Sequence, residues 1–423
     1  MLIKTITFLL LLFELSNRSD ARLPEVDMTV PDIISFYNYP IEQVEVTTQD
    51  GYILTLHRIP WGVKGKGRLR GDKKPVIFLQ HGLIASSADW VLNLPSQSAG
   101  FIFADAGFDV WMGNVRGNFY STKHVNQSVT DYWNFTWDEM ALYDIPAMID
   151  GVLKITGSEF LYYVGHSQGT EIMFTRLSLQ DGFEKKIKKF FALAPVATVT
   201  YVKGLLSYLG DKFDGQLEVC DVLSLQKVFY WFGARQFLGH NVITDFFSVL
   251  ICGSKFISPL CRNVMFQIAG PESNQWNNTR LPVYMSHTPA GTSTVNLVHW
   301  IQVHLAKKLQ KYDFGSAAKN MERYGQSTPP VYNLSTITTP TYLYFSPADW
   351  LATERDVEVR LIGCQKHKLI QETIIKQIDN QYLKRIKPMP EFNHFDFIYG
   401  LNAKEKIYDE IIKAVRQSFL IHS

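Results

Sequence analysis

The stretch Glu159–Thr170 constrains the fold of this chain more than any other. It opens with an apolar, aromatic and β-branched run, which predicts a buried parallel strand. It then turns sharply through Gly165-His-Ser-Gln-Gly169, and a helix is expected from about Thr170 to Gln180. Because the two glycines carry no Cβ, neighbouring backbone can pack on both sides of the turn. We therefore expect Ser167 to project its hydroxyl at the tip of a strained turn, and the alternative is an ordinary serine in a tight turn.

Strands and helices alternate on both sides of this stretch. A hairpin is expected near the start of the chain, and apolar strands then alternate with helix signals up to residue 195. Alternation of this kind predicts a mostly parallel sheet with helices on both faces. The expected strands are Gln43–Thr48, Tyr52–Ile59, Pro75–Gln80, Phe108–Met112, the strand before Ser167, and Phe190–Pro195.

The alternation stops at about residue 199, where the chain becomes aromatic-rich and irregular, with helix-like pieces at Ser224–Phe232 and Asn296–Lys311. It resumes with an apolar strand at Pro340–Phe345, followed by a possible strand at 382–386 and an amphipathic helix from about Ala403 to Leu420. We predict an α/β core interrupted by a mainly helical insertion. The predicted boundaries are 1–21 for a leader, 22–198 and 327–423 for the core, and 199–326 for the insertion.

A serine hydroxyl needs a base to become a nucleophile, and the base needs an orienting acid. Where a Gly-x-Ser-x-Gly turn carries the nucleophile, the acid and then a histidine follow along the chain, each in a loop just beyond a strand. Asp349 lies just beyond the C-terminal end of the apolar strand Pro340–Phe345, and His394 precedes the last helix. We therefore predict a catalytic set of Ser167, Asp349 and His394.

Other residues compete for these roles. Asp356 and Asp396 are alternative acids, but neither closes a strand. His367 also follows Asp349, within a lysine-rich stretch that is typical of a solvated surface. His81 comes too early in the chain for the base, although it could shape the neighbouring loop.

The developing oxyanion of an acyl transfer needs two preorganised backbone N–H groups. One is expected from Gln168, just after the nucleophile, and the other from the loop after the strand Pro75–Gln80, where Leu83 of His81-Gly-Leu83 is the candidate. The alternative is that His-Gly-Leu is only a tight turn.

The N-terminus has the pattern of a secretory leader. Lys4 precedes the apolar run Ile6–Phe13, and small residues at Ser19 and Ala21 predict cleavage after Ala21. The run is too short for a stable membrane anchor, and no later stretch reaches the length of a spanning helix. A secretory route permits glycans, and four acceptor sequons follow, at Asn126, Asn134, Asn277 and Asn333.

Four cysteines allow three disulfide pairings. Cys252 and Cys261 are close in sequence and are the favoured pair, whereas Cys220 and Cys364 either pair or stay free.

The sequence contains no His-Glu-x-x-His set, no Cys-x-x-Cys spacing, no phosphate loop and no dinucleotide fingerprint, so we expect neither a metal nor another cofactor. A net charge of +2 gives no indication of nucleic-acid binding. The basic clusters at 64–70 and 185–189 are interpreted as solvated loop and helix-end charges.

Taken together, these motifs resemble the acid lipase family, which contains gastric lipase and lysosomal acid lipase. The resemblance extends from about Pro31 to the C-terminus. It rests on Gly165–Gly169, His81–Leu83, Gly113–Ser121, Phe135–Met140, Ser286–Ser293 with His299-Trp300, Asp349-Trp350 and Phe392–Phe397. The stretch between Asp349 and His394 is longer than in the mammalian members, and the Ser286–Ser293 motif has no catalytic role that we can assign.

The resemblance implies an α/β-hydrolase core with a helical cap and lid, the nucleophile at Ser167, the acid at Asp349, the base at His394, and oxyanion donors at Leu83 and Gln168. It also supports a Cys252–Cys261 bridge within the cap. The expected function is a secreted or lysosomal lipase that hydrolyses triacylglycerols or cholesteryl esters at a lipid–water interface. Cap aromatic residues at 229–232 and 246–247 would line the acyl pocket, or else would only pack the cap core. The alternatives are a carboxylesterase for small soluble esters and a non-catalytic lipid-binding protein on the same fold.

Overall fold

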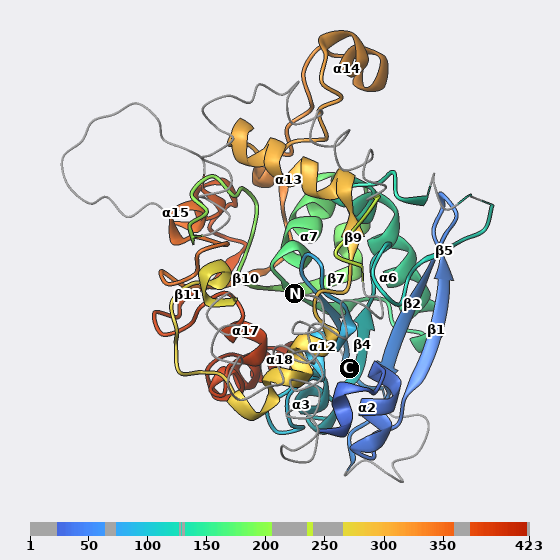
Figure 1. Cartoon of the computed structure of the whole chain (residues 1–423), viewed down its shortest axis with the longest axis vertical. Coiled ribbons are helices and arrows are strands. Elements are labelled where there is room, and N and C mark those ends of the chain that lie inside the picture. Colours follow the sequence, from blue (N-terminus) through green and yellow to red (C-terminus); the bar gives the residue numbers. More distant parts are fainter. Residues whose placement is uncertain are drawn as a thin grey trace, which may run out of the picture.

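The computed structural model describes residues 23–63, 73–126, 128, 132–204, 235–239, 265–358 and 373–420. Its centre is a nine-stranded sheet in the order β1-β2-β4-β3-β6-β7-β10-β11, with β5 paired to β2 (Figure 1). From β4 to β11 the neighbours are parallel, whereas β1 and β2 pair antiparallel. The predicted mostly parallel sheet is thus confirmed. The strands are β1 (Glu42–Thr47), β2 (Tyr52–Ile59), β3 (Val76–Gln80), β4 (Asp109–Gly113), β5 (Lys123–His124), β6 (Leu161–His166), β7 (Ile187–Leu193), β10 (Thr341–Phe345) and β11 (Leu383–Pro388).

The central strands are buried along their whole length. Every residue of β3, β4 and β6 is buried, as expected when helices cover both faces of a parallel sheet. The helix α3 packs on β4 and against the π-helix η8, while α7 packs on β6 and against α6. These helices are α3 (Ala99–Asp105), α6 (Ile145–Thr156), α7 (Gln168–Ser178) and η8 (Lys404–Tyr408), which continues into α18 (Asp409–Leu420).

Short elements complete the core. They are α2 (Val30–Phe36), α5 (Trp137–Glu139), α15 (Glu354–Val357), α16 (Ile374–Gln377), α17 (Asp396–Tyr399), the π-helix η4 (Met140–Asp144), and the 3-10 helices η1 (Pro24–Val26), η3 (Ser87–Trp90), η5 (Phe183–Lys186) and η7 (Leu334–Thr336). Within the described ranges, none of the helices combines the length and apolar character needed to cross a bilayer.

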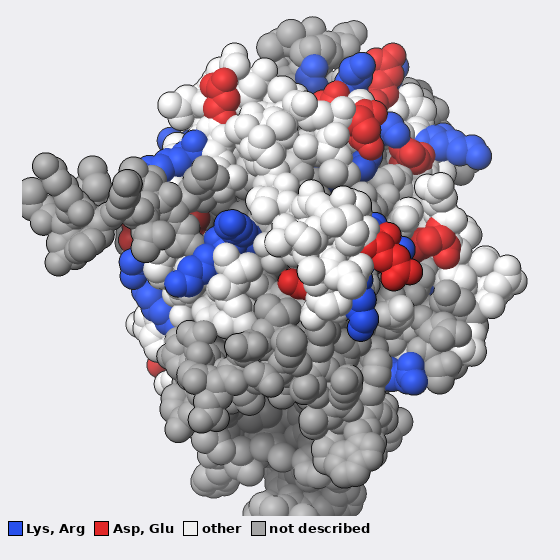
Figure 2. Space-filling view, turned by 90° about the horizontal axis from the view of Figure 1, so that it is seen from above, with Lys and Arg blue, Asp and Glu red and all other residues white. Residues whose placement is uncertain are grey.

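The chain leaves the sheet after β7, which ends at Leu193, and returns to it at β10, which begins at Thr341. The described part of this span contains η6 (Asn278–Arg280), α12 (Leu281–His287), α13 (Thr294–Ala306), α14 (Ala317–Tyr324) and a small pair of strands, β8 (Gln236–Phe237) and β9 (Thr292–Ser293). Figure 1 shows α13 and α14 above the sheet. The predicted boundaries at 199 and 326 fall inside this span and remain predictions. Seen from above, the face carries both acidic and basic side chains, separated by broad uncharged areas (Figure 2).

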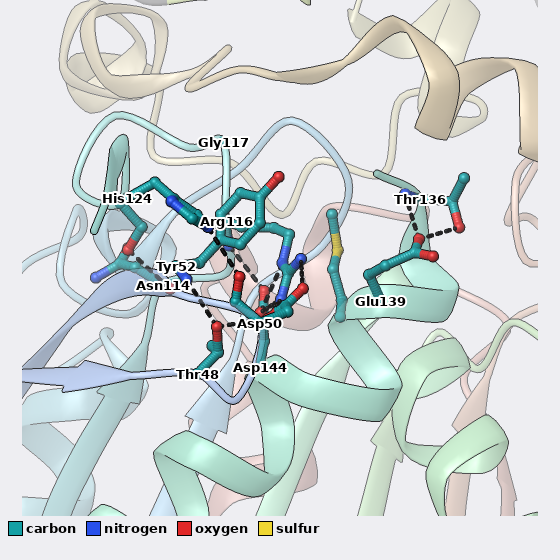
Figure 3. A network of polar contacts seen from close by, with 12 residues as sticks. Thr48, Asp50, Tyr52, Asn114, Arg116, Gly117, His124, Thr136, Glu139 and Asp144 are labelled. Atoms are coloured by element: carbon teal, nitrogen blue, oxygen red, sulfur yellow. Dashed lines mark hydrogen bonds and ion pairs between the residues drawn. The ribbon is translucent and has the colours of Figure 1, made fainter. Parts of the chain in front are cut away.

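A buried ion cluster joins the β1–β2 hairpin to the core. The guanidinium of Arg116, in the loop after β4, donates to Asp144 of η4 at 2.7 Å and to both carboxylate oxygens of Asp50 at 2.6 and 2.9 Å (Figure 3). It also lies 3.8 Å from the ring centre of Tyr52. These contacts fix the loop that runs from β4 toward the carboxyl edge of the sheet.

Candidate active site

Ser167 stands on a strained turn between β6 and α7. Its φ and ψ angles are 52° and −123°, a conformation that non-glycine residues rarely adopt. The turn is compact, because a Cβ on Gly165 would lie 2.7 Å from the carbonyl oxygen of Gly169, and a Cβ on Gly169 would lie 2.4 Å from that of Gln80. Both glycines are therefore needed for the close approach of backbone on either side of the serine.

Asp349 and His394 reach the same edge of the sheet from two neighbouring parallel strands. Asp349 lies in the loop after β10, and His394 lies in the loop after β11. The Nδ1 of His394 lies 2.8 Å from Oδ2 of Asp349, and both side chains are buried. The other carboxylate oxygen of Asp349 accepts the backbone N–H groups of Leu351 and Ala352 at 2.8 and 2.9 Å. This arrangement keeps the proton of His394 on Nδ1 and leaves Nε2 as the acceptor.

His166 links the serine turn to the histidine loop. Its Nε2 donates to the carbonyl oxygen of His394 at 2.9 Å, and the two imidazole rings are 4.9 Å apart. Burial, together with the neighbouring His394, lowers the pKa of His166 to about 3, so this ring is neutral. Sequence reasoning did not assign His166 a role, because its partner is a backbone atom 228 residues away.

The loop after β3 lies directly against the serine. A Cβ on Gly82 would lie 3.0 Å from Cβ of Ser167, and Leu83 follows that glycine. His81 braces the loop: its Nδ1 bonds the carbonyl oxygen of Gly82 at 2.8 Å, and its Nε2 accepts from the backbone of Val115 at 3.3 Å. Burial lowers the pKa of His81 to about 4, which keeps Nε2 free to accept. The loop that carries Leu83 thus approaches Ser167, and Gln168, the first residue of α7, directly follows it.

The competing acids are engaged elsewhere. Asp356 accepts from the hydroxyls of Thr198 and Thr353 and from the backbone of residues 200 and 201. Asp396 accepts the indole N–H of Trp276 at 2.9 Å and the backbone N–H of Asn393 at 2.6 Å. The competing His367 lies outside the described residues.

Two buried carboxyl groups near the histidine loop have raised pKa values. Burial raises the pKa of Asp89, which accepts the hydroxyl of Tyr399 at 2.7 Å, to about 7. Burial likewise raises the pKa of Asp396 to about 7, with the negative charge of Asp349 adding to the effect. These groups hold a proton at a pH where ordinary carboxyl groups have lost theirs.

The structure describes the four predicted glycosylation positions, but not the cysteines or the aromatic residues predicted for the cap. Asn126, Asn134 and Asn333 are exposed and Asn277 is half-buried, whereas the four cysteines and the aromatic residues at 229–232 and 246–247 lie outside the described residues. Within the described part of the chain, no group of three or more His, Cys, Asp and Glu side chains could hold a metal ion.

The fold is also found among family models and solved structures. A model described as the partial alpha/beta-hydrolase lipase region matches residues 30–94, and one described as the alpha/beta hydrolase fold matches residues 75–232. A Sulfolobus solfataricus protein of known structure matches with a TM-score of 0.50 and 14% identity, covering 86% of this chain and 90% of that one. This likeness supports the fold alone.

Curated relatives cover nearly the whole chain. Lipase lipl-3 of Caenorhabditis elegans is 51% identical over 92% of both chains. Human gastric triacylglycerol lipase is 41% identical, covering 93% of this chain and 92% of its own. Human lysosomal acid lipase/cholesteryl ester hydrolase is 42% identical with the same coverage. With identities this high over more than nine-tenths of its length, the chain belongs to the acid lipase family of α/β-hydrolases.

Proposed function

We propose that this protein is a lipase that hydrolyses carboxylic esters of long-chain fatty acids through an acyl-enzyme intermediate. The observation that carries the proposal is the hydrogen bond between His394 and Asp349 at the sheet edge where Ser167 occupies its strained turn. Relatives named for triacylglycerol and for cholesteryl ester hydrolysis are similar to this chain to nearly the same degree, which supports water-insoluble esters as the substrate class.

In the proposed first step, Oγ of Ser167 attacks the ester carbonyl carbon while Nε2 of His394 takes its proton. Asp349 holds the imidazole in the required tautomer and stabilises the positive charge. The N–H groups of Leu83 and Gln168 donate to the oxyanion. The C–O bond to the alcohol then breaks, His394 returns the proton to the departing oxygen, and the acyl group stays on Ser167.

The second step uses the same groups. Water attacks the acyl carbonyl carbon as His394 takes one of its protons, and the bond to Ser167 breaks as that proton returns to the serine oxygen. A fatty acid is released and the enzyme regains its starting state. Because His394 must be neutral at the start of each step, activity should fall where this imidazole becomes protonated.

Rates on triolein, cholesteryl oleate and p-nitrophenyl butyrate across pH test the proposal. Ser167→Ala should abolish hydrolysis, while Ser178→Ala, at the other end of α7, should leave it unchanged. A rate that jumps once substrate forms an interface indicates a lipase, whereas full activity on the soluble ester alone indicates a carboxylesterase. Hydrolysis that survives Ser167→Ala would contradict both readings, and a wild-type protein that binds lipid without turnover would indicate a binding protein.

The same proposal places the chain on the secretory route, outside the cell or in the lysosome. The leader with its cleavage position after Ala21 and the four sequons support this placement. We expect a mature chain beginning at Arg22, a Cys252–Cys261 disulfide, and glycans at Asn126, Asn134, Asn277 and Asn333. N-terminal sequencing and peptide mapping before and after glycosidase treatment and reduction check each expectation. An intact leader on the exported protein would contradict it.

A further inference from the structure

We propose that residues 290–300 of the insertion position both oxyanion donors, through side-chain contacts to Gln168 and a backbone contact beside Leu83. This segment contains the end of the Ser286–Ser293 motif, which the catalytic account leaves without a role, and the start of α13. The inference rests on the proposed function, since it assigns these residues to the same oxyanion site.

The first contact joins α13 to the side chain of Gln168. Oε1 of Gln168 accepts the indole N–H of Trp300 at 2.8 Å and the amide N–H of Asn296 at 3.0 Å. An indole nitrogen can only donate, so the amide of Gln168 must present its oxygen here. The amide nitrogen of Gln168 faces the sulfur of Met140 at 3.5 Å. With the amide group held at both ends, the residue that supplies one oxyanion donor has little freedom to move.

The second contact lies next to the other donor. The backbone N–H of Ala290 donates to the carbonyl oxygen of Ile84 at 2.7 Å, and Ile84 directly follows Leu83. Ile84 has a φ of 52°, which is unfavourable for a β-branched residue and therefore needs support from its surroundings. The carbonyl oxygen of Ala290 in turn accepts the backbone N–H of Phe119 at 2.9 Å, so the segment lies between the loops that follow β3 and β4.

The positioning segment is itself fixed to the core. Ser293 caps α13 by accepting the backbone N–H of Asn296 at 2.9 Å, and its hydroxyl donates to the carbonyl oxygen of Phe135. About two turns before the end of α13, His299 stacks on Trp137 of α5, with ring centres 4.2 Å apart and planes 11° apart. Contacts of Ser293 and His299 with the core thus hold residues 290–300 in place.

The consequence for catalysis is a matter of preorganisation. Oxyanion donors act because they already point to where charge develops, and loss of one donor lowers kcat by about 10²–10³. A small misplacement costs part of this effect. Removing the hydrogen bonds to the side chain of Gln168 should therefore lower kcat and leave KM nearly unchanged, because ground-state substrate binding does not depend on them.

The test compares Gln168→Met, Trp300→Phe and the double variant with wild type. Met fills nearly the same volume and keeps the backbone N–H, but its thioether sulfur is only a weak hydrogen-bond acceptor. Trp61→Phe, two residues beyond the end of β2, is the matched control for the loss of an indole. Active sites are titrated with a p-nitrophenyl phosphonate, so kcat refers only to correctly folded enzyme.

We expect kcat per titrated site to fall about tenfold or more in Gln168→Met, with KM within about twofold of wild type. Trp300→Phe should lower kcat by less, and the double variant should resemble Gln168→Met alone, since the shared hydrogen bond is already lost. Trp61→Phe should match wild type. An unchanged kcat in Gln168→Met, or effects of the two variants that multiply, would overturn the inference.

These outcomes separate this inference from the proposed function. If wild type hydrolyses esters and the phosphonate labels Ser167, but the Gln168 and Trp300 variants keep full kcat, only the positioning role fails. If wild type neither hydrolyses esters nor reacts with the phosphonate, the proposed function fails as well.

Discussion

The imidazole Nε2 of His166 donates to the carbonyl oxygen of His394 at 2.9 Å, so the residue before the proposed nucleophile holds the backbone of the residue proposed as its base. The backbone N–H of His394 donates to the carbonyl oxygen of Ala269 at 3.1 Å on its other side. The base is therefore fixed through its main chain as well as through its side-chain bond to Asp349.

Replacing His166 should disturb this alignment. His166→Leu removes the donor to the His394 carbonyl, and we expect kcat to fall about tenfold because the base loses part of its positioning. Steady-state rates on p-nitrophenyl butyrate measure the effect. His124→Gln is the control, since His124 also bonds a backbone carbonyl, that of Asp50 at 2.8 Å, but in the hairpin turn. Equal losses in both variants would indicate a general effect on folding.

Asp349→Asn tests the assignment of the acid. The amide can present its N–H to His394 Nδ1 and so favour the wrong tautomer, and in a serine protease triad this change lowers kcat by about 10⁴. We expect a loss of about 10³–10⁴ in kcat here. The rival acid provides the control: Asp356→Asn should lower the melting temperature while kcat per active site stays within about twofold. The reverse pattern would make Asp356 the acid.

The buried carboxyl groups of Asp89 and Asp396 should each stabilise the protein less as pH rises from about 5 to about 7. The pKa values of Asp89 and Asp396 are raised to about 7 in the folded state, above the ordinary value of 3.8. In this window the folded protein retains protons that the unfolded chain has released, so each group lowers the free energy of unfolding by about 1.4 kcal/mol per pH unit. Urea unfolding at several pH values measures the slope.

Asp89→Asn isolates one of these groups. Its amide oxygen can still accept the hydroxyl of Tyr399, but the amide does not titrate. Plotted against pH, the free energy of unfolding should therefore have a slope that is more positive than in wild type by about 1.4 kcal/mol per pH unit, which corresponds to one proton. Asp105→Asn is the matched control, because Asp105 also accepts a tyrosine hydroxyl, that of Tyr39 at 2.7 Å, but is exposed. An Asp89→Asn variant with the same pH dependence of stability as wild type would contradict the prediction.

The buried ion cluster around Arg116 should matter far more to stability than an exposed ion pair. Arg116→Leu leaves the buried carboxylate of Asp144 without its partner, which typically costs about 3–5 kcal/mol. The exposed pair of Lys123 and Glu45 is the control, and Lys123→Ala should cost no more than about 1 kcal/mol. Chemical unfolding of both variants decides the matter, and similar losses would show that the cluster contributes little.

Much of the fold could be predicted from local patterns. The β1–β2 hairpin, the strand before Ser167 and the strand before Asp349 all lie within two residues of their predicted ranges, because each is a clear apolar or alternating run between turn signals. The sequence Thr136-Trp-Asp-Glu139 has the pattern of a capping box, and the box is present, with the Thr136 side chain accepting from the backbone and the Glu139 side chain accepting from the backbone N–H of Thr136.

Other features depend on tertiary contacts that no local pattern contains. The basic cluster at 185–189 was expected to be solvated, but β7 begins at Ile187 and Lys189 is half-buried. Its ammonium group donates to the carbonyl oxygen of Ala414 and to the hydroxyl of Tyr342, so the charge is satisfied inside the structure. That interpretation was therefore wrong for Lys189, whereas Lys185 is exposed in the last turn of η5, as expected.

Inside one long helix, Pro146 would cost a backbone hydrogen bond. The chain instead forms the π-helix η4 before α6, which begins just before the proline. This wider turn contains Asp144, the buried partner of Arg116. The proline accounts for the interruption of the regular helix. Its π-helical form is explained only by the contact of Asp144 with Arg116 in the distant loop after β4.

The candidate site likewise combines features that local patterns predict with contacts that they do not. Positions after strand ends predicted that Asp349 and His394 would meet, since parallel strands end at one edge. The contacts of His166 to His394 and of Trp300 to Gln168 join residues 228 and 132 positions apart, and no spacing rule predicts such pairs.

The strands β7 and β10 pair in parallel although the whole insertion separates them, with Phe190 opposite Thr341. The insertion therefore departs from and returns to adjacent positions in the sheet, and its two ends stay fixed whatever lies between them. Changes in its length or sequence need not shift the register of a single strand. Evolution can therefore remodel this inserted span while the turn at Ser167 and the loops of Asp349 and His394 keep their places at the sheet edge.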